Sequence, residues 1–175
     1  VVLYEQSPVT RVAAGEATTA SGPVTAPVVL RATEGFTAAL PGLRELTMTS
    51  NALLLAEQAA PLAAAGLSRV NISLDSLDPV QFARITGGGK LRDVLCGIEA
   101  AGRAGLTPIK LNVVVMGGVN SHELPAFAEL ALSQPVEVRF IERMPIGELG
   151  ELGGFVSEAE MRALLADYSL TDLPY

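Results

Sequence analysis

Apolar and polar residues alternate with a period of two in four short stretches, and this alternation predicts β-strands. The strands are expected at residues 44–51, 69–75, 108–116 and 136–144. The segments between them carry apolar residues at helical spacing and predict helices at residues 52–66, from 78 onward, 90–105 and 121–134. Strands that alternate with helices form a parallel sheet with right-handed crossovers, so the pattern predicts an α/β fold.

Several residues mark where the predicted helices begin and end. Asp78 followed by Pro79 is typical of a helix start, and Ser157 with Glu160 forms a capping-box sequence that predicts a last helix. Pro61 is expected to interrupt the first helix, and glycines at 66 and 105 are expected to end the first and third. One apolar stripe on helix 90–105 is predicted to face the core: Leu91, Val94, Leu95, Ile98 and Ala101.

Residues 1–35 show little periodicity and are left unassigned, whereas residues 36–175 are expected to form the α/β unit. Two short strands are conceivable, at residues 1–4 and 26–32, and the stretch 18–27 is interpreted as a loop because it is rich in Gly, Pro, Ser and Thr. The sequence leaves open whether this segment supplies further strands or is unstructured.

Each predicted strand has one apolar and one polar face, although parallel strands are normally apolar on both. The polar faces carry Glu45, Thr47, Thr49 and Asn51; Asn71, Ser73 and Asp75; Lys110 and Asn112; and Glu137 and Arg139. Burying an unpaired charge costs several kcal/mol or more, so this face must meet water or a ligand. We expect a curved sheet, part of a (β/α) barrel, with helices on its convex face and a wet cavity on its concave face. The alternative is a two-layer sheet with one solvated face.

Composition and net charge argue against several classes of function. The chain of 175 residues is 49% apolar and 18% charged, with a formal net charge of −7. This balance argues against binding to nucleic acid or to an anionic membrane surface. No uncharged apolar run reaches the roughly 18–20 residues that a membrane span needs. The single cysteine, Cys96, cannot form an internal disulfide, which favours a cytoplasmic location, and it cannot alone hold an iron–sulfur cluster or a cysteine-type zinc site.

Other candidate motifs carry little chemistry. The stretch TGGGKL at residues 86–91 lacks the spacing and the Ser or Thr of a phosphate-binding P-loop, and it is interpreted as a connector. His122, the only histidine, is interpreted as a solvated residue in the first turn of a helix. No metal-ligand spacing occurs, so no metal site is predicted.

Four motifs occur in an order and spacing that resemble a known family. These are TMTSN at 47–51, NISLDSLD at 71–78, KLNVV at 110–114 and RFIERMP at 139–145. Together with FVSEAEM at 155–161, they look like the later half of the barrel of the radical SAM GTP 3′,8-cyclases, the MoaA family of molybdenum cofactor biosynthesis. The resemblance covers about residues 36–165. It implies a radical SAM partial barrel and a lyase that converts GTP to 3′,8-cyclo-7,8-dihydro-GTP.

The resemblance also implies roles for individual residues. Thr49 and Lys110 correspond to contacts with the substrate GTP. Ser73 lies on the strand that holds the ribose of S-adenosylmethionine, and the backbone of Met144 corresponds to a contact with its adenine. The resemblance names no catalytic residue in this chain.

The chain departs from the family pattern at its cluster ligands. The family binds [4Fe–4S] through a C-x-x-x-C-x-x-C loop and holds a second cluster in a C-terminal domain, and neither cysteine motif is present here. We therefore expect no cluster in this chain and no cyclisation by the chain alone. Three alternatives remain: an incomplete family member, a module that binds GTP or S-adenosylmethionine without chemistry, and a non-binding remnant. A homodimer through an open sheet edge is a further expectation.

Overall fold

The computed structural model describes residues 9–13, 16–19, 22–25, 45–144 and 153–171. The chain divides into two units, residues 1–46 and residues 47–175. In the first unit, β1 (Val9–Ala13), β2 (Glu16–Thr19) and β3 (Gly22–Thr25) form an antiparallel sheet in that order. The loop predicted at 18–27 is therefore wrong at residues 18–19 and 22–25, because these residues pair as the antiparallel strands β2 and β3. The strands predicted at 1–4 and 26–32 lie outside the described residues.

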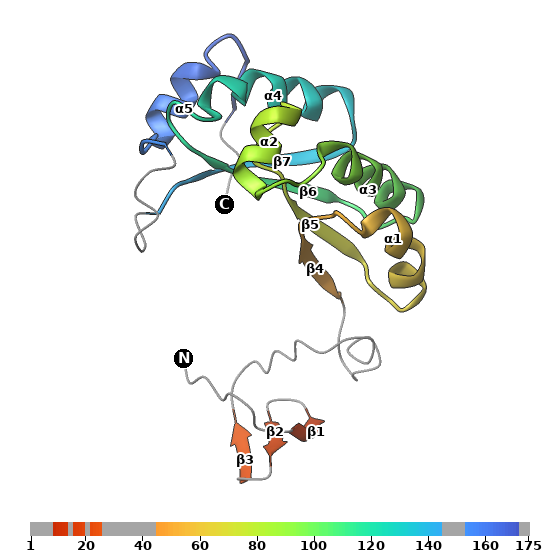
Figure 1. Ribbon diagram of the computed structural model, residues 1–175. Helices are drawn as coiled ribbons and strands as arrows, with labels where there is room; N and C mark the ends of the chain where they lie inside the picture. Colours follow the sequence, from red (N-terminus) through yellow and green to blue (C-terminus); the bar gives the residue numbers. More distant parts are fainter. Residues whose placement is uncertain (1–8, 14–15, 20–21, 26–44, 145–152, 172–175) are drawn as a thin grey trace. The chain divides into compact units, whose positions relative to one another are not determined.

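The second unit contains a four-stranded parallel sheet with the strand order β4-β5-β6-β7. All four strands predicted from alternation are confirmed, and helices lie between them as expected (Figure 1). The elements in chain order are β4 (Thr47–Ser50), α1 (Leu55–Ala64), β5 (Arg69–Ser73), α2 (Pro79–Thr86), α3 (Leu91–Arg103), β6 (Ile109–Val115), the 3₁₀ turn η2 (Ser121–Glu123), α4 (Leu124–Ser133), β7 (Val136–Glu142) and α5 (Glu158–Leu164).

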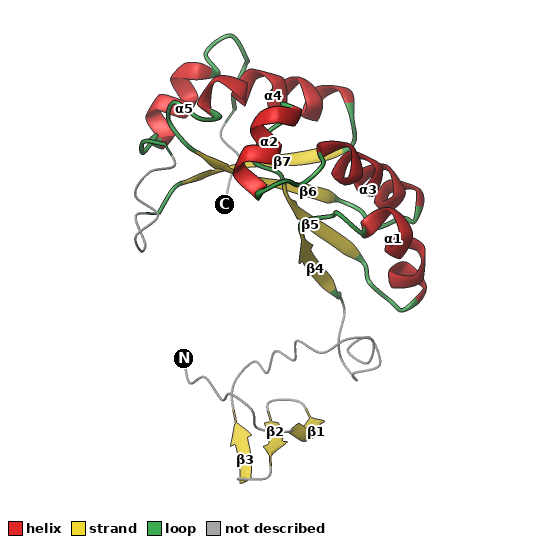
Figure 2. Ribbon diagram, in the orientation of Figure 1, coloured by secondary structure: helices red, strands yellow, loops and turns green. Residues whose placement is uncertain are grey.

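The helices of this unit gather on one side of the sheet, as Figure 2 shows. The strand residues that face them are buried, and those fully out of solvent contact are Val70, Ile72, Leu111, Val113 and Val115. Residues of the opposite face remain exposed or half-buried. The predicted α/β architecture, one helix-covered face and one polar face in the manner of a partial (β/α) barrel, is confirmed.

The helices agree with their sequence signals except at two residues, Pro61 and Leu95. Asp78 caps α2 by accepting a hydrogen bond from the Gln81 amide at 2.7 Å, and the capping box of α5 is formed in both directions. Pro61 does not interrupt α1, because it lies on the exposed side where water can reach the carbonyl group that loses its helical donor. Leu95 was predicted to face the core but is 36% exposed, because it lies at the margin of the α3 stripe.

The C-terminal helix closes a small core beside β6. Val115, Leu124, Val156, Met161 and Leu165 form this cluster, with Phe140 and Tyr168 packed against it. The cluster attaches α5 to the end of the sheet where β6 and β7 finish. Among the described residues, no helix is long and apolar enough to cross a membrane.

Candidate functional site

The register of the sheet aligns four polar residues in one row on its open face. Thr49 pairs with Asn71, Asn71 with Lys110, and Lys110 with Glu137. Neighbouring residues of a row lie about 5 Å apart, so one ligand can contact several of them. Two residues predicted to bind substrate, Thr49 and Lys110, are thus brought onto the same face of the sheet.

The centre of this row carries one compensated charge and one unpaired acceptor. Lys110 Nζ lies 2.7 Å from Glu137 Oε2, and the Lys110 side chain is 16% exposed. Asn71 Nδ2 lies 3.5 Å from Thr49 Oγ1, whereas Asn71 Oδ1 is buried and has no hydrogen-bond partner among the described residues. A buried oxygen without a donor costs about 1–3 kcal/mol, so a rearrangement or a ligand that supplies a donor would be favoured here.

A second row follows toward the carboxyl ends of the strands. Ser73 pairs with Asn112, and Asn112 pairs with Arg139. Ser73 is exposed, as a side chain that contacts a ligand must be. Met144 lies outside the sheet, two residues after β7 ends, and is 69% exposed. The structure therefore places three of the four predicted ligand contacts on the open face and the fourth at its carboxyl edge.

Asp75 extends this face one step beyond β5. Its Oδ1 accepts a hydrogen bond from the Val114 amide at 2.8 Å, which continues the pairing between β5 and β6 after the strand itself has ended. Burial raises the pKa of the Asp75 carboxyl above its ordinary value, and the hydrogen bond from Val114 offsets part of this rise.

Sequence reasoning missed two buried polar residues that organise this edge, Asn120 and Glu123. They are 1% and 7% exposed, and both bond to the loop that follows β5. Asn120 follows two glycines and a valine, and Glu123 resembles an ordinary acidic residue near a helix start. Both side chains form hydrogen bonds to a loop about 45 residues earlier in the chain. A single sequence does not reveal a contact between segments so far apart.

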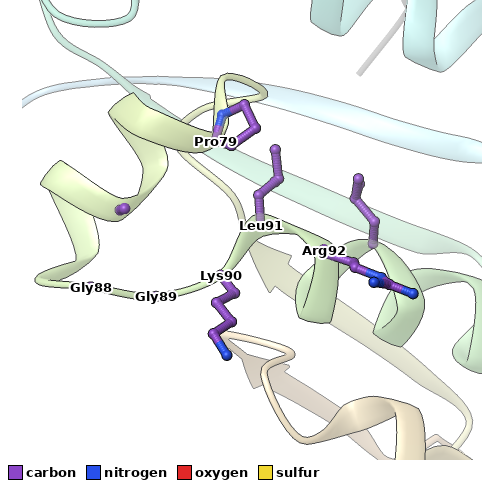
Figure 3. Close-up of a pocket in the computed structure, with 8 residues that line it drawn as sticks. Pro79, Gly88, Gly89, Lys90, Leu91 and Arg92 are labelled. Carbon is purple, nitrogen blue, oxygen red and sulfur yellow. The ribbon is translucent and has the colours of Figure 1, made fainter.

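A hollow of about 500 Å³ lies away from the open face, between α2 and the start of α3. Figure 3 shows its lining, where Lys90 and Leu91 point in opposite directions from the chain. Its walls are largely apolar, and it includes the Gly-rich connector for which the phosphate-loop interpretation was rejected. The hollow adds no polar group to the open face.

The residues present do not fit an iron–sulfur cluster. The chain has one cysteine, Cys96, which lies half-buried on α3, whereas a cluster needs several thiolates. Within the described ranges, no group of three or more His, Cys, Asp and Glu residues could hold a metal ion. The open face can bind polar ligands but offers no cluster ligands.

Comparison with known proteins assigns the chain to a family. The profile described as the Radical SAM superfamily matches residues 13–131. GTP 3′,8-cyclase 1 of Pseudomonas aeruginosa is 54% identical over 131 residues, which cover 74% of this chain and 40% of that protein. The GTP 3′,8-cyclase of Gloeobacter violaceus is 48% identical over 146 residues, or 81% of this chain and 45% of the relative.

These matches agree with the resemblance inferred from the four motifs. The chain spans less than half the length of the curated relatives it matches. Membership of the family implies S-adenosylmethionine and a [4Fe–4S] cluster as the family's cofactors. On the extent of the profile match, the chain belongs to the radical SAM superfamily.

Proposed function

We propose that this chain provides the later half of the barrel of a GTP 3′,8-cyclase of molybdenum cofactor biosynthesis and that its open sheet face binds GTP and S-adenosylmethionine. Thr49 and Lys110 contact GTP, whereas Ser73 and the backbone of Met144 contact S-adenosylmethionine. The observation that carries the proposal is the row formed by Thr49, Asn71 and Lys110, in a chain about half identical to proteins named GTP 3′,8-cyclase.

The chemistry of the row suits a nucleotide. The Lys110 ammonium can neutralise a phosphate or bind an electron-rich base oxygen. Thr49 and Ser73 supply hydroxyl groups that can donate to or accept from a ribose or a base. Because the helices cover the other face of the sheet, these side chains are accessible without any opening of the core.

The proposal concerns binding, because the chain lacks the thiolates for the family's cluster. In the family that cluster would supply the electron that cleaves S-adenosylmethionine, and the residues described here would hold and orient the ligands. A second candidate function follows from the single cysteine: a module that binds either ligand without chemistry. A cytoplasmic location and a homodimer stay predictions.

Titration calorimetry with GTP and with S-adenosylmethionine tests the proposal. The chain has two lysines, so Lys90→Ala is a matched control for Lys110→Ala. We expect Lys110→Ala to weaken GTP binding about tenfold or more, because a charge-assisted contact is lost. S-adenosylmethionine binding should change less than about twofold, and Lys90→Ala should leave both affinities unchanged. Absence of heat with both ligands would contradict the proposal and leave a non-binding remnant.

A further inference from the structure

The hollow of about 500 Å³ between α2 and the start of α3 lies on the side of the sheet that the helices cover. Apart from Lys90 and Arg92, apolar residues and glycines line it, and none of the described acidic residues does so. Its volume is within the range of roughly 300–1,000 Å³ that is typical of ligand sites. The ligand contacts proposed for the open face of the sheet leave this hollow without a role.

Hydrogen bonds hold the connector that forms one wall of the hollow. The amide of Gly88 donates to the carbonyl of Ala83 at 2.7 Å. The amide of Gly89 donates to Thr86 Oγ1 at 3.0 Å, and that hydroxyl donates to the carbonyl of Phe82 at 2.7 Å. Phe82 is buried, so the connector is tied to a fixed part of α2. The hollow is therefore preformed, which lowers the entropy that a partner must lose on binding.

Apolar side chains at this hollow are exposed to water. Leu95, which lines the hollow, is 36% exposed, and Val80, next to the lining residue Pro79, is 78% exposed. Covering such a surface removes apolar area from water and favours association.

The two cations of the lining have no partner within the described part of the chain. Lys90 and Arg92 are exposed and make no ion pair or side-chain hydrogen bond there, whereas Arg103 further along α3 pairs with Glu99 at 3.6 Å. Asp93 follows in the same turn but does not line the hollow. In Figure 3 both cationic side chains extend away from Leu91. The rim of an apolar hollow is thus positively charged, in a chain whose net charge is −7.

We propose that this hollow is a docking site for a short acidic segment of a partner protein. One apolar side chain of the segment fills the hollow, and carboxylates on either side of it meet Lys90 and Arg92. The net charge of −7 repels an extended polyanion such as a duplex or an anionic membrane, whereas a short peptide places its charges only beside the two cations. The inference goes beyond nucleotide binding and does not depend on it, because the open face is the other face of the sheet.

Fluorescence anisotropy with three labelled peptides tests the chemistry of the partner on the full chain. The first, DELFEEL, combines acidic and apolar residues; NQLFQQL lacks the charges, and DESSEES lacks the apolar side chains. We expect the first peptide to bind at least about tenfold more tightly than either of the others, because both contributions are needed. Equal binding of DELFEEL and NQLFQQL, or of DELFEEL and DESSEES, would overturn the proposal.

Matched variants test the location. Lys90→Gln and Arg92→Gln should each weaken binding of DELFEEL about threefold or more, because each removes one attractive charge. Arg103→Gln removes the same charge from the same helix but away from the hollow, so binding should change less than about 1.5-fold. Ala83→Phe should fill the hollow and abolish binding, and thermal unfolding reports whether each variant is folded. Equal weakening by all three Gln variants would mean that net charge alone is responsible and would overturn the proposal.

Two further measurements separate this site from the other possible occupants and from the nucleotide site. Lys110→Ala should keep its affinity for the peptide, whether or not the chain binds GTP, so failure of the proposed function leaves this result unchanged. Peptide-induced NMR shifts should concentrate at residues 88–92 and 95, and shifts at Thr49, Asn71 and Lys110 instead would overturn the proposal. Self-association in sedimentation velocity that Lys90→Gln abolishes would assign the hollow to a second copy of the chain and would also overturn it.

Discussion

At the scale of single residues, the polar side chains of the open face bond largely to other polar side chains of the same face. Alternation along the strands predicted which residues share this face, because the side-chain period of a strand leaves little freedom. It did not predict that Lys110 would pair with Glu137 or that Asn71 Oδ1 would lack a donor. Those details depend on the register between strands, which is set by packing across the sheet and not by any one strand.

The ion pair of Lys110 yields a prediction for substrate affinity. Glu137 neutralises the ammonium group that we propose binds GTP, so Glu137→Gln should tighten GTP binding about two- to fivefold. Glu99→Gln is the control, because it removes the same charge from an exposed pair with Arg103. Calorimetry at two salt concentrations measures the effect. Equal tightening by both variants would mean that net charge alone is responsible.

Asp75 yields a prediction for pH. Because burial raises its folded-state pKa, the folded protein binds a proton more tightly than the unfolded chain does. The contribution of the protonated Asp75 carboxyl to the free energy of unfolding is fully present below the ordinary Asp pKa of about 3.9. It is lost as the pH rises through the raised pKa of Asp75 in the folded protein. Relative to Asp75→Asn, the unmodified protein should therefore lose stability across this window. Urea unfolding at a series of pH values measures the difference, and a constant difference would contradict the account.

At the scale of elements, capping residues and apolar periodicity predicted where the helices lie. Packing between helices determines which substitutions each helix tolerates. Helix α3 is an example of each. Gly105 has a φ of +77° just after the helix, as predicted for a residue that ends it. The sequence did not indicate any role for Gly97. A Cβ at Gly97 would lie 2.7 Å from the Ala52 carbonyl oxygen and 3.1 Å from Leu55 Cβ. The close approach of α3 to the start of α1 therefore depends on this glycine.

Gly97→Ala tests that contact. The added methyl group must displace backbone, so we expect a loss of about 1–3 kcal/mol in the free energy of unfolding. Gly102→Ala on the same helix is the matched control, because its Cβ would meet Ile109 Cδ1 at an ordinary 3.9 Å. That variant should be neutral or gain up to about 1 kcal/mol from helix propensity. Similar effects of the two substitutions in urea unfolding would argue against close packing at Gly97.

At the scale of the whole molecule, the sequence predicted the parallel sheet, its polar face and its family. Its prediction for the N-terminal unit was poorer, because Gly and Pro in residues 18–27 indicated a loop where β2 and β3 pair. The buried bonds of Asn120 and Glu123 were also out of reach, since they join segments about 45 residues apart. Local patterns determine elements, whereas contacts between distant loops determine how a site is held.

NMR mapping of a GTP titration shows whether ligands bind the open face of β4–β7. We expect the amide shifts to concentrate at Thr49, Asn71 and Lys110 and to follow one dissociation constant. Shifts confined to residues 88–92, which line the hollow between α2 and α3, would place the ligand on the helical side and contradict binding to the open face.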